Sequence, residues 1–339
     1  SLIDTLNADL DALQATGRAL AALDVLCAFA ERAQHLEFVR PHLLETPGFD
    51  IRGGRHPVVE DLLPMGQDFI PNDLDLDYDN LQIAIITGPN MSGKSTYLRQ
   101  VGLMVILSQM GSYIPADSIR IGIIDQLFTR VGASDNLAGG ESTFLVEMNE
   151  TANILNNATA RSLILLDEIG RGTSTYDGVS IAWAITEYLH EHPTKAKTLF
   201  ATHYHELNEM TNSFERIKNY NVSVKEIDGK IIFLRKLKKG GSAHSFGIHV
   251  AQMAGMPNQI VSRANTIMKQ LESSHSAETL SKKAKNISKK DDIQLSFFQL
   301  DDPTLIQIRE EIMGIDINTL TPVEALLKLS EIKKHIGKK

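Results

Sequence analysis

Cysteine, tryptophan and long apolar runs are scarce in this chain of 339 residues, which has one cysteine and one tryptophan. The single cysteine, Cys27, excludes an internal disulfide framework, suits a reducing cytosol, and is interpreted as a small buried apolar residue. No run approaches the roughly eighteen uncharged apolar residues of a membrane span, which argues against membrane insertion. The first residues, SLIDTLNADL, lack the features of a secretory signal, and a start at Ser1 rather than Met indicates a fragment of a longer protein.

Positive charge is also in short supply, because 42 acidic residues outweigh 34 basic ones and give a net charge of −8. This balance argues against a chain whose whole surface grips nucleic acid. The local exception is SKKAKNISKK at 281–290, which contains five lysines. We interpret this stretch first as a solvated linker and second as a contact for a polyanion.

The apolar residues predict a long amphipathic helix followed by alternating strands and helices. Leucines recur at helical spacing over 3–35, so this helix carries an apolar stripe that needs a partner. The alternation indicates an α/β sandwich with a central, mostly parallel sheet flanked by helices. The expected elements are strand 83–87, helix 94–110, strand 121–131, helix 142–157, strand 162–167, helix 178–191 and strand 197–201.

The last third of the chain predicts a hairpin, a helix, a linker and a small helical tail. The hairpin strands at 217–227 and 230–237 turn at Asp228-Gly229, and a helix follows over 257–273. Residues 274–300 are poor in apolar residues and rich in Ser, Lys and Asp, as is typical of a linker. Residues 301–339 predict a two-helix module that associates with its own copies, since two short helices cannot cover both of their apolar faces.

The stretch GPNMSGKST has the GxxxxGKS pattern of a phosphate-binding loop, placed between a predicted buried strand and a predicted helix. The helix N-terminus and the backbone N–H groups of the loop favour phosphate, Lys94 can reach the outer phosphates, and Ser95 can place its hydroxyl on Mg²⁺. The pattern therefore predicts a site for ATP and Mg²⁺. Its nucleotide-binding residues are Gly88, Pro89, Asn90, Met91, Ser92, Gly93, Lys94, Ser95 and Thr96.

Two carboxylates end the apolar strand in LILLDE, about eighty residues after this loop. In an enzyme with such a loop, Asp167 would hold Mg²⁺ through its water shell, and Glu168 would polarise the attacking water as the general base. Loop and carboxylates together indicate ATP hydrolysis rather than binding alone.

The segment ATHYHE at 201–206 places His203 at a strand end, where it can sense or stabilise the γ-phosphate. Alternatively His203, His205 and Glu206 are metal ligands. Against this, two histidines at i and i+2 on a strand end face apart, and no fourth ligand is suggested.

The segment NLAGGESTF at 136–144 leads into a predicted helix, so its backbone N–H groups and the Ser142 hydroxyl are available to an anion. It is similar to the signature segment of ABC-type ATPases, in which one subunit's signature closes over the nucleotide of the other. Ser142 would then act in trans, and an active site would need two chains. The alternative is a glycine-rich turn with a helix cap at Ser142.

Four motifs, GPNMSGKST, GGESTFLVEM, LLDEIGRGTSTYDG and THYHEL, together resemble the ATPase domain of the MutS family of DNA mismatch-repair proteins. The resemblance implies that 1–40 is a helix returning from an absent DNA clamp and that 41–273 is a P-loop ABC-type ATPase. It also implies that Phe69 and Ile70 stack on adenine and that Asn90 lines the γ-phosphate, although Phe69 suits a core position equally well. The implied catalytic residues are Lys94, Glu168 and His203.

Partners also follow from the resemblance. They are a second copy of the chain, mismatched DNA held by N-terminal domains absent here, a MutL-type repair partner and the sliding clamp. Gln294 to Phe298, QLSFF, resembles the clamp-binding peptide of bacterial members, unless its phenylalanines pack on the tail helices. Phe29-Ala30-Glu31 matches the Phe-x-Glu motif with which the family reads a mismatch, but it lies inside the first predicted helix. The competing hypotheses are another ABC-type DNA recombination ATPase and a non-catalytic scaffold for oligomerisation and clamp binding.

Overall fold

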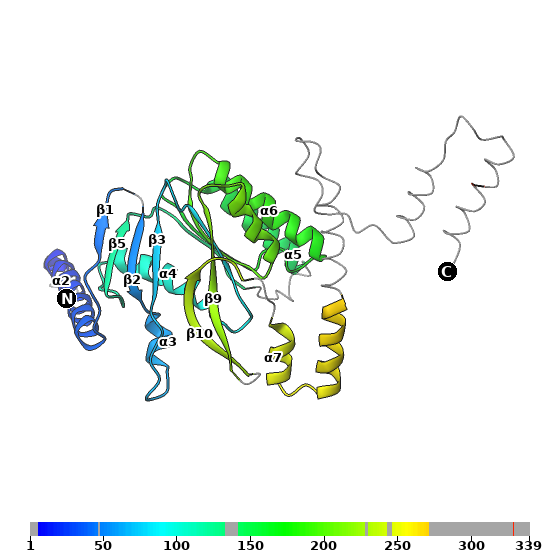
Figure 1. Cartoon of the computed structure of the whole chain (residues 1–339). Coiled ribbons are helices and arrows are strands. Elements are labelled where there is room, and N and C mark those ends of the chain that lie inside the picture. Colours follow the sequence, from blue (N-terminus) through cyan, green and yellow to red (C-terminus); the bar gives the residue numbers. More distant parts are fainter. Residues whose placement is uncertain are drawn as a thin grey trace. The chain divides into compact units, whose positions relative to one another are not determined.

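The computed structural model describes residues 6–46, 48–132, 142–227, 230–242, 246–270 and 328 (Figure 1). The chain divides into two compact units, Ser1–Met268 and Lys269–Lys339. Almost all of the second unit lies outside the described residues. The predicted linker at 274–300 and the predicted two-helix module at 301–339 fall there, with Lys328 as the one described position, and both stay predictions.

A six-stranded sheet forms the centre of the first unit (Figure 1). Its strand order is β10-β9-β4-β8-β7-β6, and every neighbouring pair is parallel except the hairpin of β9 and β10. The predicted α/β class with a mostly parallel sheet is therefore confirmed. The strands are β4 (Ile83–Thr87), β6 (Leu127–Arg130), β7 (Leu163–Asp167), β8 (Lys197–Ala201), β9 (Ile217–Ile227) and β10 (Lys230–Lys239).

Helices cover both faces of this sheet, and β4 shows why the sequence requires it. Ala84 and Ile86 pack into a core with α4 (Lys94–Gln109), whereas Ile83 and Ile85 pack into a second core with α5 (Thr143–Asn157) and α6 (Thr175–Glu191). Successive strand residues point to opposite faces, so a strand buried on both faces reads as the continuous apolar run IAIIT. The 3₁₀ helix η1 (His205–Asn212) joins the second core through Leu207.

A second, four-stranded sheet, which was not predicted, shares the first core with α4. The predicted strand at 121–131 is wrong, because its residues divide between β5 in this sheet and β6 in the other. The Gln109 side chain fixes the break, since it accepts from the backbone N–H of Ile124 at 2.6 Å and donates to the Ile124 carbonyl at 2.9 Å. The elements here are β1 (His42–Leu44), β2 (Phe49–Gly54), α3 (Pro57–Asp61), β3 (Asn72–Leu76) and β5 (Ser118–Gly122).

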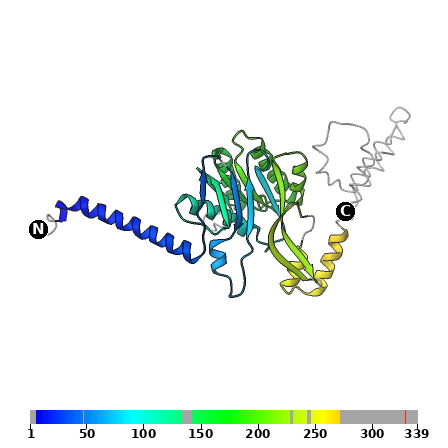
Figure 2. The same cartoon turned by 60° about the vertical axis from the view of Figure 1, so that its left-hand side comes forward.

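The long N-terminal helix is confirmed as α2 (Leu10–His35), but none of its residues is buried (Figure 2). Leu13 and Leu20 are 52% and 62% exposed, so the predicted stripe has no cover among the described residues. Cys27 is exposed as well, which makes its interpretation as a buried residue wrong. By length and composition alone α2 is apolar enough to cross a membrane, a test that core helices of soluble proteins and signal sequences also pass.

The hairpin is confirmed in β9 and β10, and its turn residues lie outside the described ones. It is followed by α7 (Gly247–Met253) and by a helix that begins at residue 258 and continues to residue 270, where the described residues stop. The predicted helix at 257–273 is thus confirmed over its described part.

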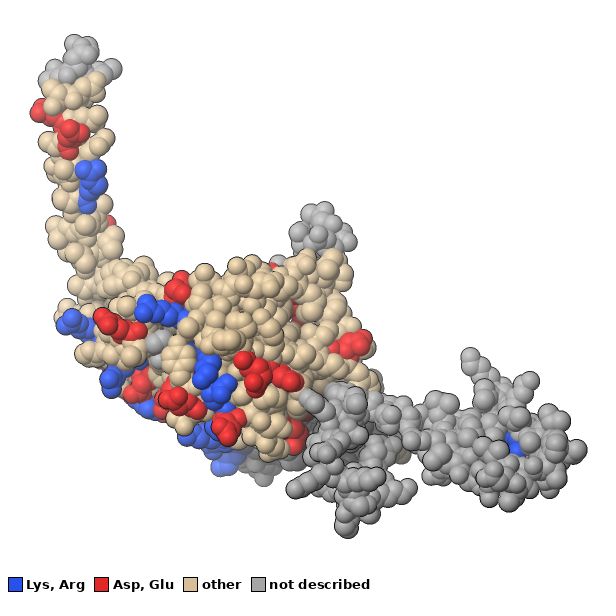
Figure 3. Space-filling model, turned by 90° about the horizontal axis from the view of Figure 1, so that it is seen from above, with Lys and Arg blue, Asp and Glu red and all other residues tan. Residues whose placement is uncertain are grey.

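Basic and acidic side chains are interspersed on the face drawn in Figure 3. Pairs such as Arg52 with Asp50 and Arg55 with Glu60, each at 2.7 Å, bring opposite charges together on the surface of the first unit. The described residues on this face therefore form no continuous basic footprint of the kind that grips nucleic acid.

Candidate functional site

The loop after β4 has three residues in the left-handed region of backbone space: Gly88 at φ 146°, Met91 at φ 68° and Gly93 at φ 104°. Gly93 is also the residue that caps the N-terminus of α4. Glycine adopts such angles without steric cost, whereas the left-handed conformation of Met91 is sterically unfavourable. A loop that turns in this way directs the first N–H groups of α4 toward the end of β4, where an anion would find unpaired donors.

Lys94 begins α4 and is 4% exposed. Its ammonium donates to the carbonyls of Gly88 at 2.7 Å and Pro89 at 3.2 Å. Burial lowers the pKa of Lys94, while the carboxylates of Glu168 and Asp167 act in the opposite direction. The positive charge is thus held inside the loop, close to both predicted carboxylates.

Asp167 is the last residue of β7. Burial raises the pKa of Asp167 and Glu168 adds to this rise, whereas the hydrogen bond from the Ser95 hydroxyl and the charge of Lys94 lower it. The Oδ1 atom of Asp167 is buried and has no hydrogen-bond partner, and the same is true of Ser92 Oγ in the loop. Ser95 and Asp167, predicted as one Mg²⁺ site, therefore lie together, and Asp167 Oδ1 is a buried oxygen without a partner.

Glu168 follows directly, in a left-handed conformation at φ 54°. The Glu168 N–H still takes part in the sheet, because it donates to the Ala201 carbonyl at 2.8 Å. The chain leaves the sheet directly after this hydrogen bond. The Glu168 carboxylate forms an ion pair with Arg171, whose side chain is 61% exposed. Strained backbone at a non-glycine residue costs about 1–3 kcal/mol and is found mainly at functional sites.

His203 follows β8, the strand between β4 and β7, and its ring contacts the Tyr204 ring in a tilted arrangement, with 4.1 Å between centroids. Partial desolvation lowers the pKa of His203, and the charge of Glu168 counteracts this. The structure therefore brings Lys94, Asp167, Glu168 and His203 to one edge of the sheet. Among the described residues, no three His, Cys, Asp or Glu side chains form a group that could hold a metal, so His203, His205 and Glu206 are not gathered as ligands.

Phe69 and Ile70 line a cavity of about 200 Å³ next to the loop, between α3, α4 and the hairpin. Loop residues form one wall of this cavity, and Arg235 and Leu237 of β10 form another. Within the loop, Pro89 is buried and Asn90 is exposed. The two residues that the resemblance assigned to adenine thus share a cavity with Met91, Ser92, Gly93 and Thr96.

Ser142 is the first described residue after a gap and serves as the N-cap of α5, without a hydrogen bond from its side chain to the helix. It is exposed and does not line the cavity of its own chain beside Phe69. Most of the predicted segment 136–144 lies outside the described residues. The prediction that Ser142 acts in trans therefore stays a prediction.

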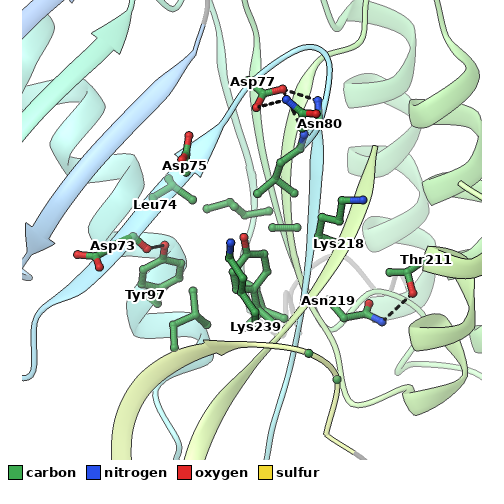
Figure 4. Close-up of a pocket in the computed structure, with 18 of the residues that line it drawn as sticks. Asp73, Leu74, Asp75, Asp77, Asn80, Tyr97, Thr211, Lys218, Asn219 and Lys239 are labelled. Carbon is green, nitrogen blue, oxygen red and sulfur yellow. Dashed lines mark hydrogen bonds between the residues drawn. The ribbon is translucent and has the colours of Figure 1, made fainter. Parts of the chain in front are cut away.

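A larger cavity of about 850 Å³ lies between β3 and the strands β4 and β9 (Figure 4). Three aspartates line it on one side and lysines of β9 and β10 on the other. Burial raises the pKa of Asp77, but N–H groups of Asn80, Asp79 and Leu81 outweigh this and lower it overall. Tyr97 lines both cavities and donates to the Asp73 carbonyl at 2.9 Å, so its ring forms part of the wall between them.

Sequence reasoning missed three residues of this site, namely Arg171, Glu147 and Tyr204. Glu147 of α5 accepts a hydrogen bond from the Gly170 N–H at 2.5 Å, and the Tyr204 hydroxyl donates to the Gly170 carbonyl at 2.8 Å. All three lie within the quoted motifs, but nothing in the motifs signals these contacts. Those of Glu147 and Tyr204 join segments that are distant in the sequence, whereas Arg171 pairs with Glu168 three residues away.

Fold and site define an α/β protein in which a GxxxxGKS loop faces two carboxylates at the ends of parallel strands. The family model described as MutS domain V matches residues 84–272 of this chain, more than half of its length. The chain therefore belongs to the MutS family.

Similar proteins carry the name DNA mismatch repair protein MutS. That of Christiangramia forsetii is 61% identical over 328 residues, covering 97% of this chain and 38% of the relative. That of Flavobacterium johnsoniae is 62% identical over 321 residues, covering 94% and 36%, and that of Phocaeicola vulgatus is 60% identical over 337 residues, covering 99% and 39%. The chain thus spans less than two fifths of the length of these relatives.

Proposed function

We propose that this chain is the ATP-binding and ATP-hydrolysing module of a DNA mismatch-repair protein, built as a P-loop ABC-type ATPase. One observation carries the proposal: Lys94, Asp167, Glu168 and His203 meet at the carboxyl ends of β4, β7 and β8, around the GxxxxGKS loop. Ligands of open α/β sheets bind outside the carboxyl ends of the strands. The names of the relatives support the biological setting.

The residues present fit ATP and Mg²⁺. A buried polar atom without a hydrogen bond costs about 1–3 kcal/mol, and more when it is charged. Asp167 Oδ1 and Ser92 Oγ are such atoms, and the carboxylate oxygen suits a hard cation that prefers oxygen ligands. When bound, Mg²⁺ would neutralise charge on the phosphates, with Ser95 and Asp167 as its protein ligands. Phe69 and Ile70 would pack on the adenine.

Each polar side chain then has a distinct task. Lys94 supplies a fixed positive charge for the outer phosphates, and burial strengthens its electrostatic effect. Glu168 acts as the general base, taking a proton from the attacking water. His203, whose pKa is lowered by partial desolvation, would donate a hydrogen bond to the γ-phosphate.

The ion pair with Arg171 uses one oxygen of the Glu168 carboxylate, Oε2, and proton transfer from water to that oxygen would require the pair to open. Arg171 is mostly exposed, and exposed ion pairs contribute about 0–1 kcal/mol. Opening is therefore cheap compared with the barrier of hydrolysis.

The module acts as a homodimer in which Ser142 of each copy completes the nucleotide site of the other. Nucleotide state is coupled to mismatch recognition by parts of the protein outside this chain. A MutL-type partner and the sliding clamp, which would bind through QLSFF at 294–298, complete the assembly. We place the protein in the cytoplasm.

Phosphate release with the unaltered chain tests the proposal. We expect turnover of ATP that requires Mg²⁺ and stops when a chelator is added. A scaffold without catalysis would bind its partners but release no phosphate, and that result would overturn the proposal.

The tail at 301–339 is proposed to join dimers into tetramers, with one stripe at Leu305, Ile308 and Ile312. Light scattering on the whole chain and on a version ending at Lys290 measures this. We expect the whole chain to have the higher, concentration-dependent mass. Equal masses at tens of micromolar would contradict it.

A further inference from the structure

Gly170, two residues after the proposed general base, is bound at both its N–H and its carbonyl by side chains of other elements. Glu147 of α5 accepts from the Gly170 N–H at 2.5 Å, and Tyr204, from the turn after β8, donates to the Gly170 carbonyl at 2.8 Å. Glu147 and Tyr204 are only 6% and 4% exposed. A charged acceptor for a buried N–H makes a short and strong hydrogen bond.

Close packing constrains Gly170 further. Gly170 has φ 88°, and a Cβ added there would lie 2.6 Å from the Gly178 carbonyl oxygen in α6. A Cβ at Gly178 would lie 2.2 Å from the Tyr204 hydroxyl and 2.3 Å from the Gly170 carbonyl oxygen. The hydroxyl can therefore reach Gly170 only because Gly178 has no side chain. A Cβ at either glycine would therefore force its neighbours to shift.

Glu147 is itself held in place. Arg130 at the end of β6 lies 3.7 Å from its other carboxylate oxygen, and the same arginine pairs with Glu150 at 3.1 Å. One turn earlier in α5, Phe144 packs against Gly172, where a Cβ would lie 3.1 Å from the Phe144 Cβ. The loop after Glu168 is thus attached to α5 at two points.

The geometry points to Glu147 and Tyr204 as positioning residues for Glu168, an inference that rests on the proposed hydrolysis of ATP. Glu168 lies between the sheet hydrogen bond to Ala201 on one side and the clamped Gly170 on the other. Its left-handed φ is held by these two anchors. Since Ser142 is the N-cap of α5 and Tyr204 is adjacent to His203, the clamp connects the base with two other residues predicted to contact a nucleotide.

Steady-state kinetics on variants of the whole chain test this. Misplacing a catalytic group by about 1 Å can reduce turnover by about 10²-fold without changing substrate binding. We expect Glu147→Ala to lower kcat by about 30- to 100-fold and Tyr204→Phe by about tenfold, with ATP affinity within about twofold of the unaltered chain. Glu147→Gln keeps an acceptor for the N–H and should recover most of the rate.

Two matched controls separate positioning from general damage. Glu150→Ala removes the other partner of Arg130 without touching the loop, and Tyr78→Phe removes a tyrosine hydroxyl that donates to a carbonyl, Ala160, elsewhere. Both should keep kcat within about twofold. In the Glu168→Ala background, adding Glu147→Ala should slow turnover no further, because both changes act through the same base.

The outcomes are distinct. Normal kcat in Glu147→Ala and Tyr204→Phe, or an additive loss in the double variant, would overturn the positioning role and leave the proposed function intact. A lowered ATP affinity that accounts for the whole loss would overturn it as well. No turnover in the unaltered chain would overturn the proposed function and the positioning role with it.

Discussion

Two buried lysines of this protein, Lys94 and Lys197, lie in contrasting surroundings. Burial lowers the pKa of both, that of Lys197 to about 8. Lys197 lies over the Tyr78 ring at 3.2 Å and donates to the Lys195 carbonyl, so its partners are fixed parts of the fold. Lys94 donates to two loop carbonyls and lies near the carboxylates of Glu168 and Asp167, and Asp167 Oδ1 has no hydrogen-bond partner. A buried charge alone therefore marks no site, whereas a buried charge that faces other ionisable groups at the strand ends favours one.

The largest expected effect comes from Lys94→Ala. It should reduce hydrolysis below detection and weaken ATP binding by about tenfold or more, because the charge opposite the outer phosphates is lost. Calorimetric titration with ATP measures the affinity. Lys197→Met is the matched control, a buried lysine whose loss should leave binding and turnover unchanged. Unchanged affinity in Lys94→Ala would remove this residue from the site.

Glu168→Ala should lower turnover by on the order of 10² while ATP still binds, as expected for the loss of a general base. Single-turnover measurements with saturating ATP separate the chemical step from binding. Normal turnover in this variant would show that another group takes the proton.

Ser142 can be tested by mixing two inactive chains. In a dimer of a Lys94→Ala chain with a Ser142→Ala chain, one composite site keeps both residues. Random pairing makes half of the dimers mixed, so we expect recovery of about a quarter of the unaltered activity. If mixed dimers form and no activity returns, Ser142 does not complete the site of the partner copy.

The smallest effect concerns Lys197 and stability. Its pKa is about 8 in the folded chain and 10.5 unfolded, so the unfolded chain binds more protons between these pH values. The charge therefore destabilises the fold by ~3 kcal/mol below pH 8, and the penalty is lost as the pH rises toward 10.5. Lys197→Met should be more stable than the unaltered chain at pH 7 by about 1–2 kcal/mol, because the lost cation–π contact offsets part of the gain.

Urea unfolding at pH 7 and at pH 9.5 checks this. The advantage of Lys197→Met should shrink at the higher pH. A difference between the two proteins that is the same at both values would contradict the buried, weakly basic lysine.

The sequence predicted β4 and β7 well because these parallel strands are nearly continuous apolar runs, IAIIT and LILLD. It failed for β3, NDLDL, in which Leu74 and Leu76 alternate with aspartates. That alternation was available as a signal, but the acidic residues made it resemble a loop. Its burial depends on pairing with β2, whose residues lie 18 to 27 positions away along the chain, and the local pattern does not contain this information.

The residues of the candidate site also fall into two groups, those that the sequence pattern indicates and those that it does not. Lys94, Asp167, Glu168 and His203 could be found because each lies at a strand end or in a loop motif, and parallel strands bring these ends together. Glu147 and Tyr204 could not, since their contacts with Gly170 join residues 23 and 34 positions apart in the sequence. Such contacts follow from packing between elements rather than from spacing within one.

The uncovered face of α2 has a practical consequence for the behaviour of the purified chain. Isolated helices are marginal in water, and this one carries exposed leucines over 26 residues. At high concentration copies of α2 should pair through this stripe and add to the measured mass, whatever the tail does. Both samples in the light-scattering comparison keep α2, so their difference reports the tail alone, whereas the absolute mass of either sample does not.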